Sequence, residues 1–117
     1  MKLLDFTNRV IDEGIAAVKE DYKDPKDKDK LDGAIEGFEL CRDKEPHEIE
    51  VLLIQAREAT LQAQRERSDN YWTFRCRDLE IEWVANCVSF VLQSAGEPVI
   101  IPPTIRGAIK AVSIIGA

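Results

Sequence analysis

The side chains best suited to binding chemistry lie in the segment from Arg65 to Arg77. This stretch holds four arginines and the aromatic pair Tyr71 and Trp72, against two acidic residues. Arginine beside tyrosine and tryptophan is typical of protein-interface hot spots, and also of surfaces on which single-stranded nucleic-acid bases stack. The candidate binding residues are Arg65, Arg67, Tyr71, Trp72, Arg75 and Arg77.

Three interpretations of this segment stay open. The first is structural, with Trp72 in the core and the arginine stems extending around it. The second is a protein interface, and the third is a contact with phosphate or nucleic acid. Broad coverage of the protein by nucleic acid is not expected, because phosphate binding needs clustered positive charge and this chain has a net charge of −6.

Two carboxylate pairs at helical spacing are the next candidates, Glu45 with Glu48 and Glu66 with Asp69. They resemble the paired acidic motifs with which all-helical nucleotide pyrophosphohydrolases hold magnesium. The resemblance implies a magnesium-dependent nucleotide hydrolase as an alternative function. However, the pairs lie at opposite ends of one predicted helix, about 30 Å apart. Solvated glutamates, favoured at the first turn by the helix dipole, are therefore the preferred interpretation.

The sequence holds other residues that could bind a metal or act as nucleophiles. Their spacing predicts no metal site, no cofactor and no catalytic residue. His47 is the single histidine and falls in the first turn of a predicted helix, with no nucleophilic motif nearby. In residues 21–32, an EF-hand register places Lys28 and Lys30 where calcium needs oxygen ligands. The three cysteines are an odd number without metal-type spacing, which predicts reduced, structural thiols: Cys41, Cys76 and Cys87.

Helical periodicity dominates the chain and predicts an all-α, single-domain bundle of about five helices over residues 1–117. Apolar positions from Leu4 to Tyr22 predict the first helix, in which Gly14 marks a close helix contact. Five aspartates and four lysines in residues 21–32 predict a solvated loop. A second helix follows, from Asp29 or Asp32.

Pro46 suits the first turn of a third helix, and a fourth is predicted from Asp69 to Ser94. The fourth helix is apolar on two sides toward its C-terminal half, which predicts a central position. Its Asp78 is interpreted as an ordinary surface ion-pair residue. Its main apolar stripe comprises Trp72, Cys76, Leu79, Trp83, Cys87 and Phe90.

After an extended proline-rich link, Thr104 is predicted to cap a short apolar helix over residues 105–115. This helix is too short to span a bilayer, so we expect it to dock into the core. The second interpretation is a homodimer surface, formed through Ile105, Ile109 and Val112.

The acidic surplus belongs to one part of the chain. Residues 1–50 hold 15 acidic and 9 basic side chains, whereas residues 51–117 hold 7 of each. Together with the absence of a signal-type segment, this composition predicts a cytoplasmic, non-catalytic protein-binding or regulatory module. A basic protein, such as one that binds nucleic acid, would be its natural partner. Inhibitor or immunity-like proteins of bacteria and phage are similar in general make-up.

Overall fold

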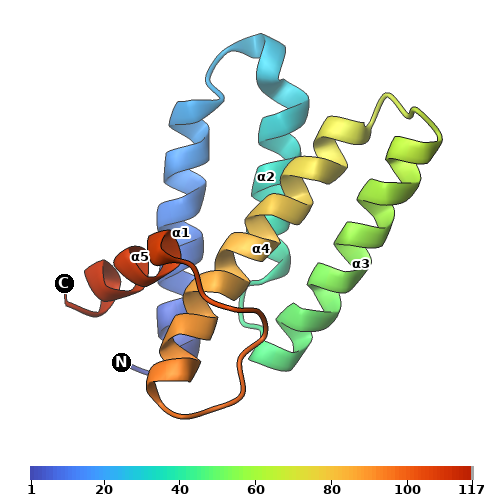
Figure 1. Ribbon diagram of the computed structural model, residues 1–117. Coiled ribbons are helices and arrows are strands. Elements are labelled where there is room, and N and C mark those ends of the chain that lie inside the picture. Colours follow the sequence, from blue (N-terminus) through green and yellow to red (C-terminus); the bar gives the residue numbers. More distant parts are fainter. Residues whose placement is uncertain (117) are drawn as a thin grey trace.

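The computed structural model describes residues 1–116, so Ala117, the last residue of the predicted domain, lies outside the described residues. Residues 1–116 form an all-α fold without strands (Figure 1), which confirms the predicted fold class. The elements are α1 (Leu3–Asp21), the 3-10 helix η1 (Pro25–Asp27), α2 (Lys28–Leu40), α3 (Pro46–Arg65), α4 (Tyr71–Ser94) and α5 (Ile105–Ile115).

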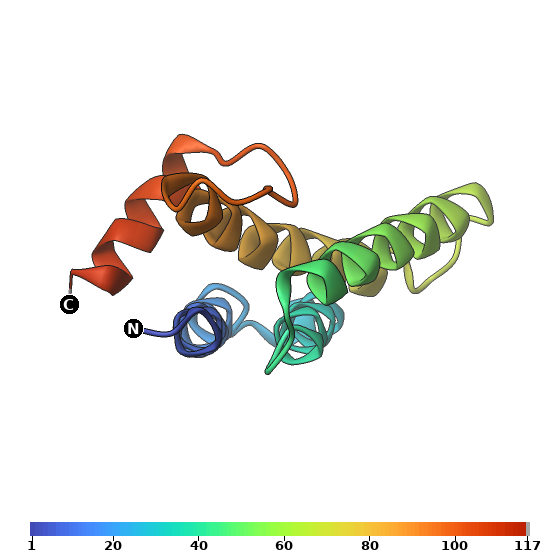
Figure 2. The ribbon, with the colours of Figure 1, turned by 90° about the horizontal axis from the view of Figure 1, so that it is seen from below.

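Helix α4 is the central element, as predicted, because all four other α-helices pack against it. Helices α1 and α2 run antiparallel, side by side on one face of α4 (Figures 1 and 2). Helix α5 packs on α4 and α1, whereas the substantial packing of α3 is with α4. The groove between α3 and α4 therefore lies at one edge of the bundle.

The tightest helix contact, between α2 and α4, depends on two glycines. A β-carbon on Gly33 would overlap the backbone of Thr73, and one on Gly37 would lie 2.5 Å from the carbonyl oxygen of Arg77. Only glycine lets the two backbones approach this closely. The predicted close contact at Gly14 is also confirmed, because a β-carbon there would overlap the ring of Phe38.

Two predicted boundaries are wrong by a few residues. Helix α2 begins at Lys28, so residues 28–32 of the predicted solvated loop are helical. Their charges do not prevent this, because they stay in water and because Lys28 pairs with Asp32 one turn later. Helix α4 begins at Tyr71 rather than Asp69, because Ser68 to Asn70 form the turn that precedes it.

The predicted apolar stripe of α4 is wrong at its first residue. Trp72 is 55% exposed, and the ammonium of Lys30 lies 4.9 Å from its ring centroid. The surface role predicted for Asp78 is also wrong, since this residue is only 3% exposed. The buried side of α4 instead comprises Cys76, Asp78, Ile81, Val84, Ala85, Asn86, Cys87, Val88 and Ser89.

Buried polar side chains of α4 attach the proline-rich link and α5. The hydroxyl of Ser89 accepts hydrogen bonds from the backbone N–H groups of Ile100 and Ile101. Asn86 Oδ1 accepts one from the N–H of Thr104 at 2.7 Å. Thr104 in turn accepts from Gly107 N–H, which confirms its predicted capping role.

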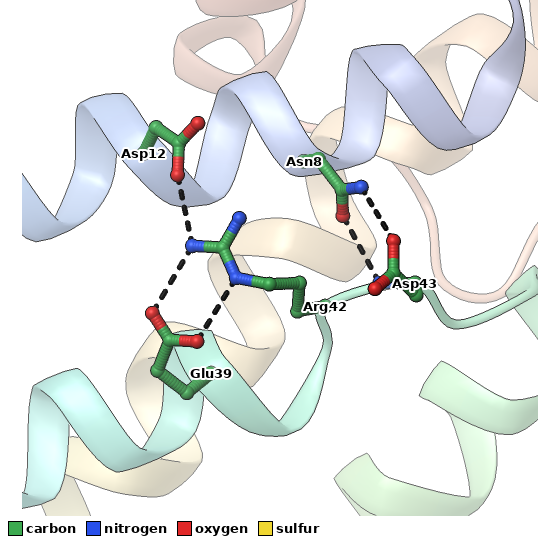
Figure 3. Close-up of polar contacts among 5 residues, drawn as sticks. All are labelled: Asn8, Asp12, Glu39, Arg42 and Asp43. Atoms are coloured by element: carbon green, nitrogen blue, oxygen red, sulfur yellow. Dashed lines mark hydrogen bonds and ion pairs between the residues drawn. The ribbon is translucent and has the colours of Figure 1, made fainter.

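A polar cluster joins the C-terminal end of α2, and the turn that follows it, to α1 (Figure 3). Arg42 donates hydrogen bonds to Asp12 of α1 and to Glu39 of α2. Asn8 exchanges two hydrogen bonds with Asp43, whose φ of 58° makes this a left-handed turn position. The cluster is exposed, so it orients the turn more than it stabilises the fold.

Candidate functional site

The structure divides the predicted arginine–aromatic site between two sides of α4. Tyr71 and Arg75 line a cavity shared with α3, whereas Trp72 lies by Lys30 of α2 and Arg77 pairs with Glu36 of α2 at 3.2 Å. Arg65 and Arg67, near the α3–α4 turn, are exposed. The rings of Tyr71 and Trp72 meet edge to face, with their centroids 5.2 Å apart, but the six predicted residues do not form one surface.

The α2 side of this set has a structural role. The Arg77 guanidinium lies 4.9 Å from the ring centroid of Phe74 while it pairs with Glu36. Thr73 donates a hydrogen bond to the carbonyl oxygen of Asp29. These contacts hold α2 against α4, so Arg77 is best understood as a packing residue.

The α3 side forms a cavity of about 400 Å³, which we call the α3–α4 groove. On each helix, the contributing residues recur at spacings of three and four, so they share one helix face. The groove is lined by Arg57, Thr60, Leu61 and Gln64 of α3 and by Tyr71, Arg75 and Asp78 of α4.

Asp78 lies buried between two half-exposed arginines. Its Oδ2 is 3.5 Å from Arg75 Nη1 and its Oδ1 is 3.8 Å from Arg57 Nε, so both distances exceed those of a good charge-assisted hydrogen bond. Arg57 makes its short contact, 2.9 Å, with Glu82 instead. Asp78 Oδ1 consequently has no hydrogen-bond partner within residues 1–116.

The electrostatics of Asp78 reflect this placement. Burial raises the pKa of its carboxyl above the ordinary value; the positive charges of Arg75 and Arg57 oppose the rise, and the negative charge of Glu82 adds to it. An acceptor oxygen that is both buried and unpaired is costly in free energy. The groove thus contains one acceptor without a donor, between two guanidinium groups.

Sequence reasoning missed Arg57 and treated Asp78 as a surface residue. The usable signal was the spacing Tyr71, Arg75, Asp78, which places all three on one face of α4. The buried state of Asp78 has no such signal, because it depends on how closely α3 packs against that face.

The two carboxylate pairs do not meet. Glu45 and Glu48 are occupied by a capping box at the start of α3, whereas Glu66 and Asp69 follow its other end. No group of three or more potential metal ligands occurs in the part of the chain that the structure describes. The geometry therefore gives no support to a magnesium site at these residues.

Helix α5 presents a second candidate surface. It docks through Gly107, Ala111 and Ile114, and the opposite face leaves aliphatic side chains in water. The exposed fractions of this α5 aliphatic face are 81% for Ile105, 65% for Ile109, 57% for Val112 and 52% for Ile115.

A mainly apolar hollow of about 320 Å³ adjoins the C-terminal end of this face. Ile115 belongs to both, so the two features form a continuous surface. The terminal hollow, as we call it, is lined by Met1, Leu3, Phe6, Val91, Leu92, Ala95, Glu97 and Ile115.

The chain matches no family model, no curated protein and no solved structure. Among residues 1–116, every helix is too short or too polar to cross a membrane.

Proposed function

We propose that this protein is a non-catalytic protein-binding module that acts through the α5 aliphatic face. The observation that carries the proposal is the exposure of four large aliphatic side chains on one 11-residue helix. A stripe of exposed aliphatic residues is typical of an interaction site. Covering these side chains removes apolar surface from water, which favours association.

The partner we propose has an amphipathic segment with an apolar stripe and basic flanks. Its apolar stripe would cover Ile105, Ile109 and Val112, in the manner of helix-in-groove recognition. Its basic flanks would face the acidic surplus of residues 1–50 rather than α5, which carries Arg106 and Lys110, and that surplus speeds the encounter with a positive partner. A cytoplasmic site of action is part of the proposal, and the three free, buried cysteines fit a reducing compartment.

The test uses the double variant Ile109→Glu/Val112→Glu and a matched control, Val51→Glu/Ile54→Glu. The control residues are about half exposed as well, but they lie on α3. Proteins captured from the native host would be identified, purified and titrated against each form. We expect the α5 variant to weaken binding about tenfold or more and the control to change it little.

Two results would contradict this proposal. One is a purified partner that binds the α5 variant as well as the wild type. The other is the absence of any specific partner at moderate salt. Binding that is insensitive to salt would remove only the basic character of the partner.

A homodimer is the second candidate, favoured by the spacing of the same residues. In an antiparallel pair of α5 helices, Ile109 faces Val112 of the second copy and Ile105 faces Ile115. Ile105 would then lie at the terminal hollow of the other copy, since Ile115 borders it. Sedimentation velocity over a range of concentrations decides this point: a wild-type dimer that Ile109→Glu/Val112→Glu converts to monomer supports it, and a monomeric wild type excludes it.

A further inference from the structure

The α3–α4 groove combines donors and an acceptor that no internal contact uses fully. Arg75 meets an acidic partner only at 3.5 Å from Asp78 and is about 40% exposed. Within the described residues, the side chains of Tyr71 and Gln64 make no hydrogen bond, although both line the cavity. The groove therefore offers guanidinium, hydroxyl and amide donors above one unpaired carboxylate oxygen.

This set of groups specifies the ligand. Guanidinium groups bind oxyanions such as phosphate and carboxylate through paired N–H donors. An ionised carboxylate, however, repels a fully deprotonated oxyanion and accepts a hydrogen bond only from a group that carries a proton. An oxyanion that retains one hydroxyl satisfies both requirements, because it accepts from the arginines and donates to Asp78.

We propose that the α3–α4 groove binds a singly protonated phosphate group, with Arg57 and Arg75 holding its oxygens and Asp78 accepting its hydroxyl proton in a hydrogen bond. The cavity of about 400 Å³ is larger than a phosphate ion requires and falls in the usual range of small-molecule sites. Leu61 and the ring of Tyr71 add apolar wall beside the polar groups. A phosphate monoester with a compact organic group fits this lining, and free phosphate shares the same chemistry.

Opening of the site requires only small movements. The long distances from Asp78 to Arg57 and Arg75 mean that neither guanidinium is held by a short bond to that carboxylate, although Arg57 must share its donors with Glu82, to which it is hydrogen-bonded at 2.9 Å. Arg75 can move toward water, since its side chain is more than one-third exposed and has no shorter contact. Asp78 itself is fixed by the packing of α3 on α4, so it acts as a stationary acceptor.

The experiment compares phenyl phosphate with phenyl sulfate, which have nearly the same shape but differ in the ability to retain a proton. Titrations by calorimetry at constant ionic strength are run near pH 6, where about half of a phosphate monoester carries the proton. We expect saturable 1:1 binding of phenyl phosphate, with phenyl sulfate about tenfold weaker or more, as for a hydrogen bond to a charged group. Inorganic phosphate in a third titration distinguishes a site for the free ion from one for the ester.

Variants test the assigned roles. Arg75→Gln should weaken phenyl phosphate about tenfold, whereas Arg65→Gln, outside the groove, should leave binding unchanged. Asp78→Asn replaces the acceptor with an amide that can donate to sulfate, so the preference for phosphate should fall to about threefold or less. Tyr71→Phe removes one hydroxyl and provides a mild variant if Asp78→Asn fails to fold.

Three results would overturn the proposal. They are no saturable binding of either phosphate compound by the folded wild type, equal affinity for phenyl phosphate and phenyl sulfate, and equal losses for Arg75→Gln and Arg65→Gln. None depends on α5, so this site and the protein-binding function succeed or fail separately.

Discussion

Gly33 of α2 lies against the backbone of Thr73 in α4 so closely that a β-carbon at position 33 would lie 2.8 Å from the Thr73 carbonyl carbon. The obstructing atoms belong to a helix backbone and not to the end of a flexible side chain. The two helices can therefore lie this close only because residue 33 has no side chain.

Gly33→Ala should lower the free energy of unfolding by about 1–3 kcal/mol or more, because α2 must move away from α4 and loosen the packing along their whole contact. Chemical denaturation followed by circular dichroism measures the change. Asp32→Ala is the control on the exposed side of the same turn, and it loses only a surface ion pair with Lys28, worth about 0.5 kcal/mol. Equal stability of Gly33→Ala and wild type would show that the two helices can separate freely.

Asn86→Ala should release the start of α5, because it leaves the backbone N–H of Thr104 without its acceptor. We expect a loss of about 1–3 kcal/mol, the usual cost of an unpaired, partly buried donor. Hydrogen exchange should also become faster in residues 100–107, whereas exchange in α3 should not change. The exposed Gln93→Ala, about two turns further along α4, serves as the control.

Glu80 should make the protein less stable as the pH rises from about 4.5 to about 7. Burial, with a smaller contribution from the negative charge of Asp21, raises the pKa of the Glu80 carboxyl from 4.5 to about 7. In that interval, the folded state binds more protons than the unfolded state, so stability declines as the pH increases.

Glu80→Gln removes this titration. Its stability relative to wild type should increase through the same interval and then stay constant above pH 7. Urea denaturation at several pH values provides the curves, and Glu58→Gln, an exposed position on α3, provides the reference. A difference between wild type and Glu80→Gln that does not vary with pH would contradict the raised pKa.

The three thiols should resist modification in the folded protein. Burial raises the pKa of Cys41 and of Cys87 to about 12 and also raises that of Cys76, so little reactive thiolate is present near pH 8. A colorimetric thiol reagent should label none of them quickly until urea is added, and all three afterwards. Ser94→Cys, on the exposed end of α4, should react at once and so verify the reagent. Rapid labelling of one native thiol would reveal an opening of the core near that residue.

The number and order of the helices could be predicted from the sequence because they follow from apolar spacing and from proline and glycine positions. The cap at Thr104 and the close contact at Gly14 were predictable for the same local reasons. The spacing of apolar residues predicts Trp72 in the core, because spacing alone cannot tell where a neighbouring helix ends. Its ring lies beside Lys30 in the first turn of α2, where little else covers it.

The candidate site was less predictable, since it depends on pairs of residues from different helices. Arg75 was recognised and Arg57 was not, although both approach Asp78. Their meeting is fixed by the register of α3 against α4, and no local pattern encodes that register. The sequence shows that α5 is rich in aliphatic residues. Which side of α5 packs on α4 depends on the fit of Gly107 against Asn86.

The edge position of α3 has a consequence for how the bundle can open. Detaching α3 breaks its one extensive helix–helix contact, with α4, whereas removing α5 disturbs packing with two other elements and removing α1 or α2 disturbs packing with three. Helix α3 can therefore separate from α4 by a movement about the turn of residues 66–70 while the other helix contacts stay in place. A molecule held by Arg57 and Arg75 would bridge the two helices, and at a free concentration of 100 times its Kd it would make that opening about 2.7 kcal/mol harder. Because α3 and α4 line the groove together, binding of the molecule would slow amide exchange in α3, and the exchange rates would then measure how much of the groove is occupied.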